Sequence, residues 1–185
     1  MTKAQLTVLA GPTAVGKGTV VAALTKHYPT LKVSVSATTR DPRPRELNGV
    51  HYYFVSPQEF DAMIERGDML EWALVHGKNK YGTPRGPVDE ALNAGHPVLL
   101  EIDLAGARQV RANRPDAQFI FLAPPSWEEL ERRLIGRDTE GPEEQARRLA
   151  TARVELQAAS EFDHVVINDD VERAVDELAR LIGLE

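Results

Sequence analysis

Residues 5–20, QLTVLAGPTAVGKGTV, decide the fold. The first six form a short, mostly apolar run, which is typical of a strand buried on both faces, and the apolar residues after position 19 recur at helical spacing. Between the two, Gly11, Gly16 and Lys17 match the spacing G-x-x-x-x-G-K. A strand, a glycine-rich turn and a helix in this order predict a loop that binds phosphate.

The chemistry of such a loop follows from its backbone. Backbone N–H groups surround the anion, the helix N-terminus adds partial positive charge, and Lys17 reaches the outer phosphates. The usual motif continues with Ser or Thr, whose hydroxyl binds Mg²⁺, whereas this chain has Gly18 and then Thr19. The metal would then be held by phosphate oxygens, water and a carboxylate elsewhere. The same Lys-Gly-Thr order occurs in adenylate kinases, so we predict a working loop.

Composition limits the alternatives. A chain of 185 residues with 42% hydrophobic content suits one compact domain. No apolar run approaches the roughly 20 residues of a membrane span, and the N-terminus lacks a signal-peptide pattern, so we expect a cytoplasmic protein without a membrane partner. Without cysteine there is no disulfide, thiolate metal site or cysteine nucleophile. A net charge of −6 argues against general nucleic-acid binding.

Further apolar runs indicate the fold class. Short runs rich in β-branched residues lie at 98–104, 118–123 and 164–168, separated by helical patterns. In residues 169–184 the apolar positions share one helix face behind an Asp-rich start. The sequence therefore predicts an α/β protein, the three-layer fold of P-loop proteins with a mostly parallel central sheet.

Two segments interrupt this alternation. One is rich in Pro, Gly and Tyr, alternates in VHYYFV, and contains a helix opened by the capping box at residues 56–59. The other begins with a capping box at residues 126–129 and holds two arginine-bearing helices. The predicted organisation is one domain, 1–185, with a core at 1–35, 87–125 and 159–185, an inserted subdomain at 36–86 and a helical segment at 126–158.

A second anion site is predicted in the inserted segment. Arg40 and Arg43 stand three apart in a turn stiffened by proline, and Tyr52 follows. Two guanidinium groups and a phenol that converge on one anion would form a monophosphate pocket. An exposed basic turn is the alternative for an isolated R-x-x-R.

At this point the chain resembles a known family. The blocks SATTRDPRPRELNGVHYYF, LEWALVHGKNKYGTP, LLEIDLAGA and FLAPPSWEELERRLIGRDTE are similar to guanylate kinases, nucleoside monophosphate kinases of the P-loop NTPase group, over nearly the whole chain. The resemblance implies that residues 36–86 bind GMP, that residues 126–158 form a lid over ATP, and that the γ-phosphoryl group of ATP passes to GMP with Mg²⁺ on the triphosphate. Scaffold modules related to guanylate kinases are also similar, but their phosphate loop is typically degraded.

The resemblance also implies residue roles. ATP would contact Gly11, Pro12, Thr13, Ala14, Val15, Gly16, Lys17, Gly18, Thr19 and Asn168. The GMP phosphate would contact Arg40, Arg43, Tyr52 and Tyr81, and the base would contact Ser36, Glu71, Thr83 and Glu101. Guanine presents N1–H and its amine as adjacent donors, whereas adenine has an acceptor at N1. Carboxylates at Glu71 and Glu101 would therefore favour guanine. For Asn168, an ordinary turn residue is the alternative.

The remaining predicted residues would bind hydrated Mg²⁺ or neutralise charge on the phosphates. Asp103 follows a strand at the edge where open α/β sheets bind ligands, and we assign it to the hydration shell of Mg²⁺, with a strand-end cap as the alternative. Arg133 and Arg137 are four apart on one helix face, and Arg148 follows on the next helix. Closing over ATP, these arginines would neutralise the transferring phosphoryl group, although surface arginine is the common alternative. The predicted catalytic residues are Lys17, Arg40, Asp103, Arg133, Arg137 and Arg148.

Some features depart from the family or fit other functions. Arg45 and Asp138 occupy positions where guanylate kinases usually have Gly, and VHGKNKYG holds one extra residue. The DLAG stretch also fits the D-x-x-G of GTPases, but their N-K-x-D signature is missing. A kinase for another monophosphate, a non-catalytic binding module and a GTPase switch remain alternatives. The oligomeric state cannot be predicted from the sequence.

Overall fold

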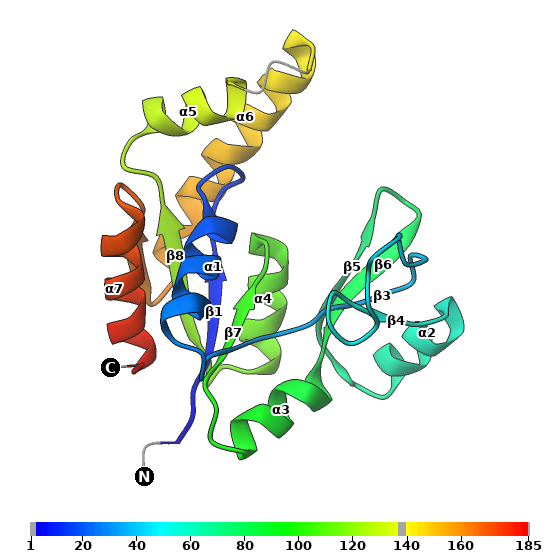
Figure 1. Ribbon diagram of the computed structural model, residues 1–185. Helices are drawn as coiled ribbons and strands as arrows, with labels where there is room; N and C mark the ends of the chain where they lie inside the picture. Colours follow the sequence, from blue (N-terminus) through cyan, green and yellow to red (C-terminus); the bar gives the residue numbers. More distant parts are fainter. Residues whose placement is uncertain (1–2, 137–139, 185) are drawn as a thin grey trace.

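A parallel sheet forms the centre of the molecule. The computed structural model describes residues 3–136 and 140–184 (Figure 1). The five strands of this sheet lie in the order β2 (Lys32–Val33), β7 (Val98–Glu101), β1 (Leu6–Ala10), β8 (Gln118–Ala123) and β9 (His164–Ile167). Every neighbouring pair is parallel, and β1 is buried at all its positions. The apolar run before the phosphate loop thus forms the middle strand.

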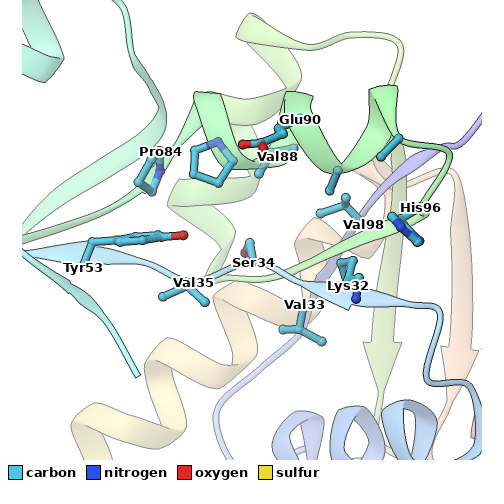
Figure 2. A pocket seen from close by; sticks show the side chains of 13 residues that line it. Lys32, Val33, Ser34, Val35, Tyr53, Pro84, Val88, Glu90, His96 and Val98 are labelled. Atoms are coloured by element: carbon cyan, nitrogen blue, oxygen red, sulfur yellow. The ribbon is translucent and has the colours of Figure 1, made fainter. Parts of the chain in front are cut away.

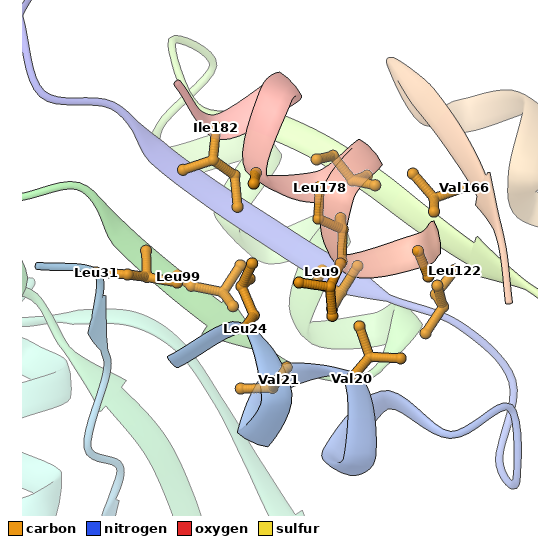
Figure 3. Packing of buried hydrophobic residues seen from close by; sticks show 14 of the residues in the cluster. Leu9, Val20, Val21, Leu24, Leu31, Leu99, Leu122, Val166, Leu178 and Ile182 are labelled. Carbon is orange, nitrogen blue, oxygen red and sulfur yellow. The ribbon is translucent and has the colours of Figure 1, made fainter. Parts of the chain in front are cut away.

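Helices cover both faces of this sheet. Helices α1 (Lys17–His27) and α7 (Val171–Ile182) pack on one face, while α3 (Arg85–Asn93) and α4 (Leu104–Asn113) pack on the other. Figure 3 shows the first face, where side chains of β1, α1 and α7 interdigitate. Full burial of one leucine contributes roughly 1.5–3 kcal/mol, so this cluster fixes the loop between β1 and α1. The predicted three-layer α/β fold is confirmed.

A second, smaller sheet stands beside the first (Figure 1). Its order is β4 (Tyr53–Phe54), β3 (Ala37–Thr38), β6 (Asn79–Pro84) and β5 (Met69–Val75), with only β3 and β4 parallel. Helix α2 (Pro57–Glu65) packs on it through the buried Phe60. All of these elements lie within residues 36–86, although the division into core, subdomain and lid stays a prediction.

The two arginine-bearing helices project past the carboxyl ends of the central strands (Figure 1). They are α5 (Trp127–Ile135) and α6 (Pro142–Gln157), and a short 3₁₀ turn, η1 (Ala158–Glu161), follows. Leu130, Leu134 and Ala152 form their shared core, and the Arg153 guanidinium lies 3.9 Å from the centre of the Trp127 ring. This arm is therefore packed within itself.

Several element boundaries differ from the prediction. The strand expected over 98–104 ends at Glu101, because Asp103 caps helix α4, which begins at Leu104. Alternation in VHYYFV yields only the two residues of β4. In the first capping box Ser56 accepts the N–H of Glu59, but the Glu59 carboxylate pairs with Arg66. No helix in the described part of the chain is long and apolar enough to cross a membrane.

Candidate nucleotide site

The phosphate loop has a backbone that glycine makes possible. It joins β1 to α1 and enters the left-handed region at Ala14 (φ 70°) and Gly16 (φ 96°). A Cβ atom on Gly11 would lie 2.4 Å from the Leu122 carbonyl oxygen, and one on Gly16 would lie 2.8 Å from Nδ2 of Asn168. Close neighbours therefore require glycine at both positions, and the left-handed turn requires it at Gly16 as well.

The peptide between Val15 and Gly16 is oriented from outside the loop. The Val15 carbonyl accepts hydrogen bonds from Asn168 Nδ2 at 2.8 Å and from Arg133 Nη1 at 3.2 Å. In a planar trans peptide the N–H points opposite to the carbonyl, so the Gly16 N–H points towards the other side. Asn168 is only 4% exposed, and supporting the loop is the contact it makes here. Its contact with adenine stays a prediction.

Lys17 lies at the carboxyl end of β7. Its Nζ donates to the Ile102 carbonyl at 3.3 Å. Burial lowers the pKa of Lys17, while the charges of Glu101, Glu155 and Asp103 act in the opposite direction. Glu155, from the half-buried face of α6, was missed by the sequence analysis, because nothing in ARVELQ shows which helix residue faces Lys17. An anionic phosphate would supply the compensation that this buried cation lacks.

Asp103 acts first as a helix cap. Its Oδ1 accepts the N–H of Gly106 at 2.8 Å and caps helix α4, whereas the sequence analysis named a strand-end cap as the alternative; the role towards Mg²⁺ stays a prediction. Gly18, which lacks the usual hydroxyl, has open space where a side chain would stand. Across residues 3–136 and 140–184 no three His, Asp or Glu side chains form a metal-binding group. These residues fit a metal held chiefly by phosphate oxygens.

Glu71 and Thr83 form a buried polar pair. They lie opposite each other in the β5–β6 ladder, and Thr83 Oγ1 donates to Glu71 Oε1 at 2.8 Å. Burial raises the pKa of Glu71, and the nearby charge of Asp103 adds to this, while the bond from Thr83 lowers it. A Cβ on Gly106 would lie 3.0 Å from Glu71 Oε2 and 3.1 Å from Asp103 Oδ1, so the first turn of α4 lies against both carboxylates.

The other residues predicted to hold the base lie at the surface of the site. Glu101 is exposed at the end of β7. Ser36 is half-buried, and its carbonyl accepts the N–H of Tyr53 at 2.8 Å. Both therefore keep side chains accessible to a ligand.

Some of the residues predicted to bind the GMP phosphate lie close together, and one does not. The Arg40 guanidinium lies 5.3 Å from the Tyr52 ring centre, and the Tyr52 and Tyr81 rings are 5.9 Å apart. Glu46, which the sequence analysis missed, accepts from Arg40 Nη1 at 2.9 Å and Nη2 at 3.0 Å. Arg43 is exposed, and its backbone N–H also bonds to Glu46. In the sequence, the only sign of this contact is that an acidic residue stands three positions after Arg43.

The predicted lid arginines have different environments. Arg133 contacts the phosphate loop, as described above, and also pairs with Glu129 at 3.3 Å. Arg148 pairs with Glu140 and with Glu144. Arg137 and Asp138 lie outside the described residues. A hollow of about 420 Å³ separates the loop from α6, lined by Thr13, Glu144, Arg147, Arg148 and Thr151.

A different cavity lies away from these residues. Figure 2 shows a pocket of about 360 Å³ between β2 and α3, where the chain passes from one sheet to the other. Val33, Val35, Pro84 and Val88 are among its lining residues, and none of the predicted site residues lines it. The candidate site is therefore the region from the phosphate loop to the second sheet.

The three-layer fold and the phosphate loop place the chain in the P-loop class of nucleotide-binding proteins. The family model described as guanylate kinase matches residues 3–185. A guanylate kinase of Leifsonia xyli subsp. xyli is 60% identical over 96% of this chain and 70% of its own length. One of Thermobifida fusca is also 60% identical, over 97% and 91%. The crystal structure of guanylate kinase from Anaplasma phagocytophilum, 31% identical, has a TM-score of 0.74 over 99% of this chain and 86% of that one. The chain belongs to the guanylate kinase family.

Proposed function

We propose that this protein transfers the γ-phosphoryl group of ATP to GMP, giving ADP and GDP. One observation carries the proposal beyond family membership. The same chain combines an intact phosphate loop with Lys17 and a separate sheet that holds the buried Glu71–Thr83 pair and is followed at β3 by Arg40. A non-catalytic relative would not need the first, and a simple nucleotide hydrolase would not need the second.

The phosphate loop is proposed to bind ATP. The Gly16 N–H, turned away from Asn168 and Arg133, and the amino group of Lys17 would hold the outer phosphates. The hollow lined by Thr13 and Arg148 would receive the nucleotide under α6. Arg133, Arg137 and Arg148 would neutralise charge on the transferring group when the arm closes.

The second sheet is proposed to bind GMP. The phosphate would meet Arg40, Arg43, Tyr52 and Tyr81, and the base would meet Glu71 and Thr83, with Ser36 and Glu101 beside them. The Glu71 carboxylate can accept from the two adjacent donors of guanine, whereas adenine would place its N1 acceptor against this buried carboxylate. No general base is required, because the acceptor is a phosphate oxygen that is already anionic at neutral pH.

Mg²⁺ is proposed as the cofactor, bound with ATP, where it neutralises phosphate charge. Asp103 would hold it through water, since Gly18 supplies no hydroxyl and one Asp103 oxygen already caps α4. The small-molecule partners would be ATP and GMP. A cytoplasmic location stays a prediction.

Turnover with ATP and GMP tests this function. In an assay coupled to ADP formation, we expect Lys17→Ala and Arg40→Ala each to lower kcat/KM by at least about a hundredfold, because each removes a charge that faces a transferring or accepting phosphate. Lys26→Ala and Arg66→Ala, which change exposed cations in α1 and after α2, are the matched controls. A normal rate in either test variant would refute the role assigned to that residue.

A further inference from the structure

The Glu46 carboxylate accepts three hydrogen bonds within the loop that joins β3 to β4. It accepts two hydrogen bonds from the Arg40 guanidinium and one, at 2.7 Å, from the backbone N–H of Arg43. The bond from Arg40, followed by that from Arg43, lowers the pKa of Glu46 to about 2. The carboxylate is therefore ionised throughout the physiological pH range.

The loop is folded so that this carboxylate meets Arg40. The N–H of Glu46 donates to the Arg43 carbonyl at 3.0 Å, which closes a four-residue turn with Pro44 and Arg45 at its centre. Arg45 has φ 74°, the left-handed conformation that a type II turn requires at its third position. Backbone conformation and side-chain bonds thus fix Glu46 together.

Arg40 has five N–H donors in a rigid fork, and Glu46 binds the edge formed by its two Nη groups. Glu46 takes one hydrogen from each Nη, and the Asp41 carbonyl takes another from Nη1 at 3.0 Å. The Nε–H and the second Nη2–H form the other two-donor edge, and the Tyr81 hydroxyl, itself a predicted phosphate contact, also accepts a hydrogen bond from the guanidinium. Tyr52 lies at 5.3 Å and Phe54 at 6.0 Å from the guanidinium, and their rings limit its tilt.

We propose that Glu46 is a positioning residue for the acceptor nucleotide. It holds one edge of Arg40 so that the edge formed by Nε and Nη2 is presented to the GMP phosphate as a bidentate donor pair. The inference rests on the proposed binding of GMP at Arg40. Since Arg40 is immobilised before the nucleotide arrives, less side-chain freedom is lost on binding. The opposite role, in which Glu46 competes with phosphate for Arg40, predicts the opposite effect of removing its charge.

Glu46→Gln separates these roles. The amide oxygen can still accept from Arg43, but the amide nitrogen would face Arg40 donor to donor. We expect the KM for GMP to rise about tenfold to a hundredfold, the loss of a charge-assisted bond, with the KM for ATP unchanged within about twofold. Glu59→Gln, an exposed carboxylate on the same sheet's helix, is the matched control. An unchanged or lower KM for GMP would overturn the proposal.

A double-mutant cycle shows whether Glu46 acts through Arg40. With GMP affinity measured by calorimetry, Glu46→Gln should add less than about a twofold loss when Arg40 is already Ala. The same fold loss in both backgrounds would also overturn the proposal. If the wild-type protein neither binds nor phosphorylates GMP, the proposed function itself fails.

A measurement on the wild-type protein tests the same role without depending on how a variant folds. In ¹⁵N NMR spectra of arginine side chains, assigned with Arg40→Lys, the Nη groups of Arg40 should rotate slowly both without and with GMP. The Nε–H signal should shift most when GMP binds. Freely rotating Nη groups in the GMP complex would contradict a role for Glu46 in positioning.

Discussion

Glu71 is 9% exposed, and burial raises the pKa of its carboxyl group above the usual range. The charged form is therefore less stable in the folded protein than in the unfolded chain, where water solvates it. Only the hydroxyl of Thr83 is bonded to it among the described side chains. The residue proposed to recognise guanine thus lowers the stability of the unliganded protein at neutral pH.

Glu71→Gln should therefore stabilise the protein while it weakens recognition. Because the folded pKa of Glu71 is raised, its destabilising effect appears as pH rises above the ordinary glutamate pKa and is complete above the folded value. Urea unfolding should show a larger free energy of unfolding for Glu71→Gln than for wild type at pH 8, with a smaller gain at pH 5. The preference for GMP over AMP should fall about tenfold or more.

The exposed Glu90→Gln serves as the control for this experiment, since it removes the same charge without a buried site. No stability gain at pH 8 for Glu71→Gln, or an unchanged preference for GMP, would contradict the role of Glu71.

The backbone conformation of Arg45 also lowers the stability of the protein. Its φ of 74° is unfavourable for a side chain with a Cβ atom and is allowed readily by glycine, the residue expected there from the family. Arg45→Gly should stabilise the protein by about 0.5–1 kcal/mol net, because relief of strain exceeds the added freedom of the unfolded chain. The midpoint temperature of thermal unfolding should rise by about 2 °C. Arg45→Ala, which keeps Cβ, should give no such gain, and equal gains in both variants would refute the strain.

At the scale of elements, helix α4 connects the two sheets. Its capping residue and first turn lie against Glu71, and its middle contacts β5 directly. Gln109 accepts from the Trp72 N–H at 3.0 Å and donates to the Trp72 carbonyl at 2.9 Å, as a neighbouring strand would. Asn113 donates to the Leu70 carbonyl at 2.9 Å. The sheet proposed to bind GMP is thus held against the core partly by side chains of α4.

Gln109→Ala tests this attachment. It leaves the Trp72 N–H and carbonyl without their partner, so the free energy of unfolding should fall by about 1–3 kcal/mol. Since Glu71 directly precedes Trp72, the KM for GMP should rise, while the KM for ATP should change little. Gln58→Ala, at an exposed position of α2, is the control. A loss of stability without a change in the KM for GMP would mean that Gln109 does not position the base site.

Elements formed by contiguous patterns could be predicted from the sequence. The strand at 118–123 was predicted at its observed bounds, because five of its six residues are apolar and a proline follows directly. The phosphate loop was predictable for the same reason, since its glycines and lysine are adjacent in the chain. The end of β7 was not, because the apolar run continues through Ile102 and Leu104 and nothing in it shows that helix α4 begins at Leu104, after its cap Asp103.

Contacts between distant segments could not be predicted from the pattern. Asn168 and Arg133 both reach the Val15 carbonyl from elements far along the chain, and Glu155 faces Lys17 from α6. Their roles depend on how the helices pack. Glu46 is close to Arg40 in sequence, yet its bonds depend on the left-handed turn at Arg45, which an arginine does not signal.

In the whole molecule, the arm formed by α5 and α6 is bonded to the core where α6 ends. Arg108 forms a two-point ion pair with Glu161, at 2.9 and 2.7 Å, where α6 ends in η1. Asp163 Oδ2 accepts the N–H of Phe119 at 2.8 Å, which holds the next residues to the central sheet. The arm is thus anchored at one end and projects over the phosphate loop at the other. This arrangement suits the proposed lid, which would bring its arginines to ATP.

The central claim is that the core sheet binds the phosphate donor and the second sheet selects the acceptor. Incubation of the wild-type protein with γ-labelled ATP, Mg²⁺ and equal concentrations of GMP, AMP and UMP tests both parts at once. We predict that the label appears in GDP and that Glu71→Gln shifts part of it to other diphosphates. Label released only as inorganic phosphate, or spread equally over the three diphosphates by the wild-type protein, would contradict the claim.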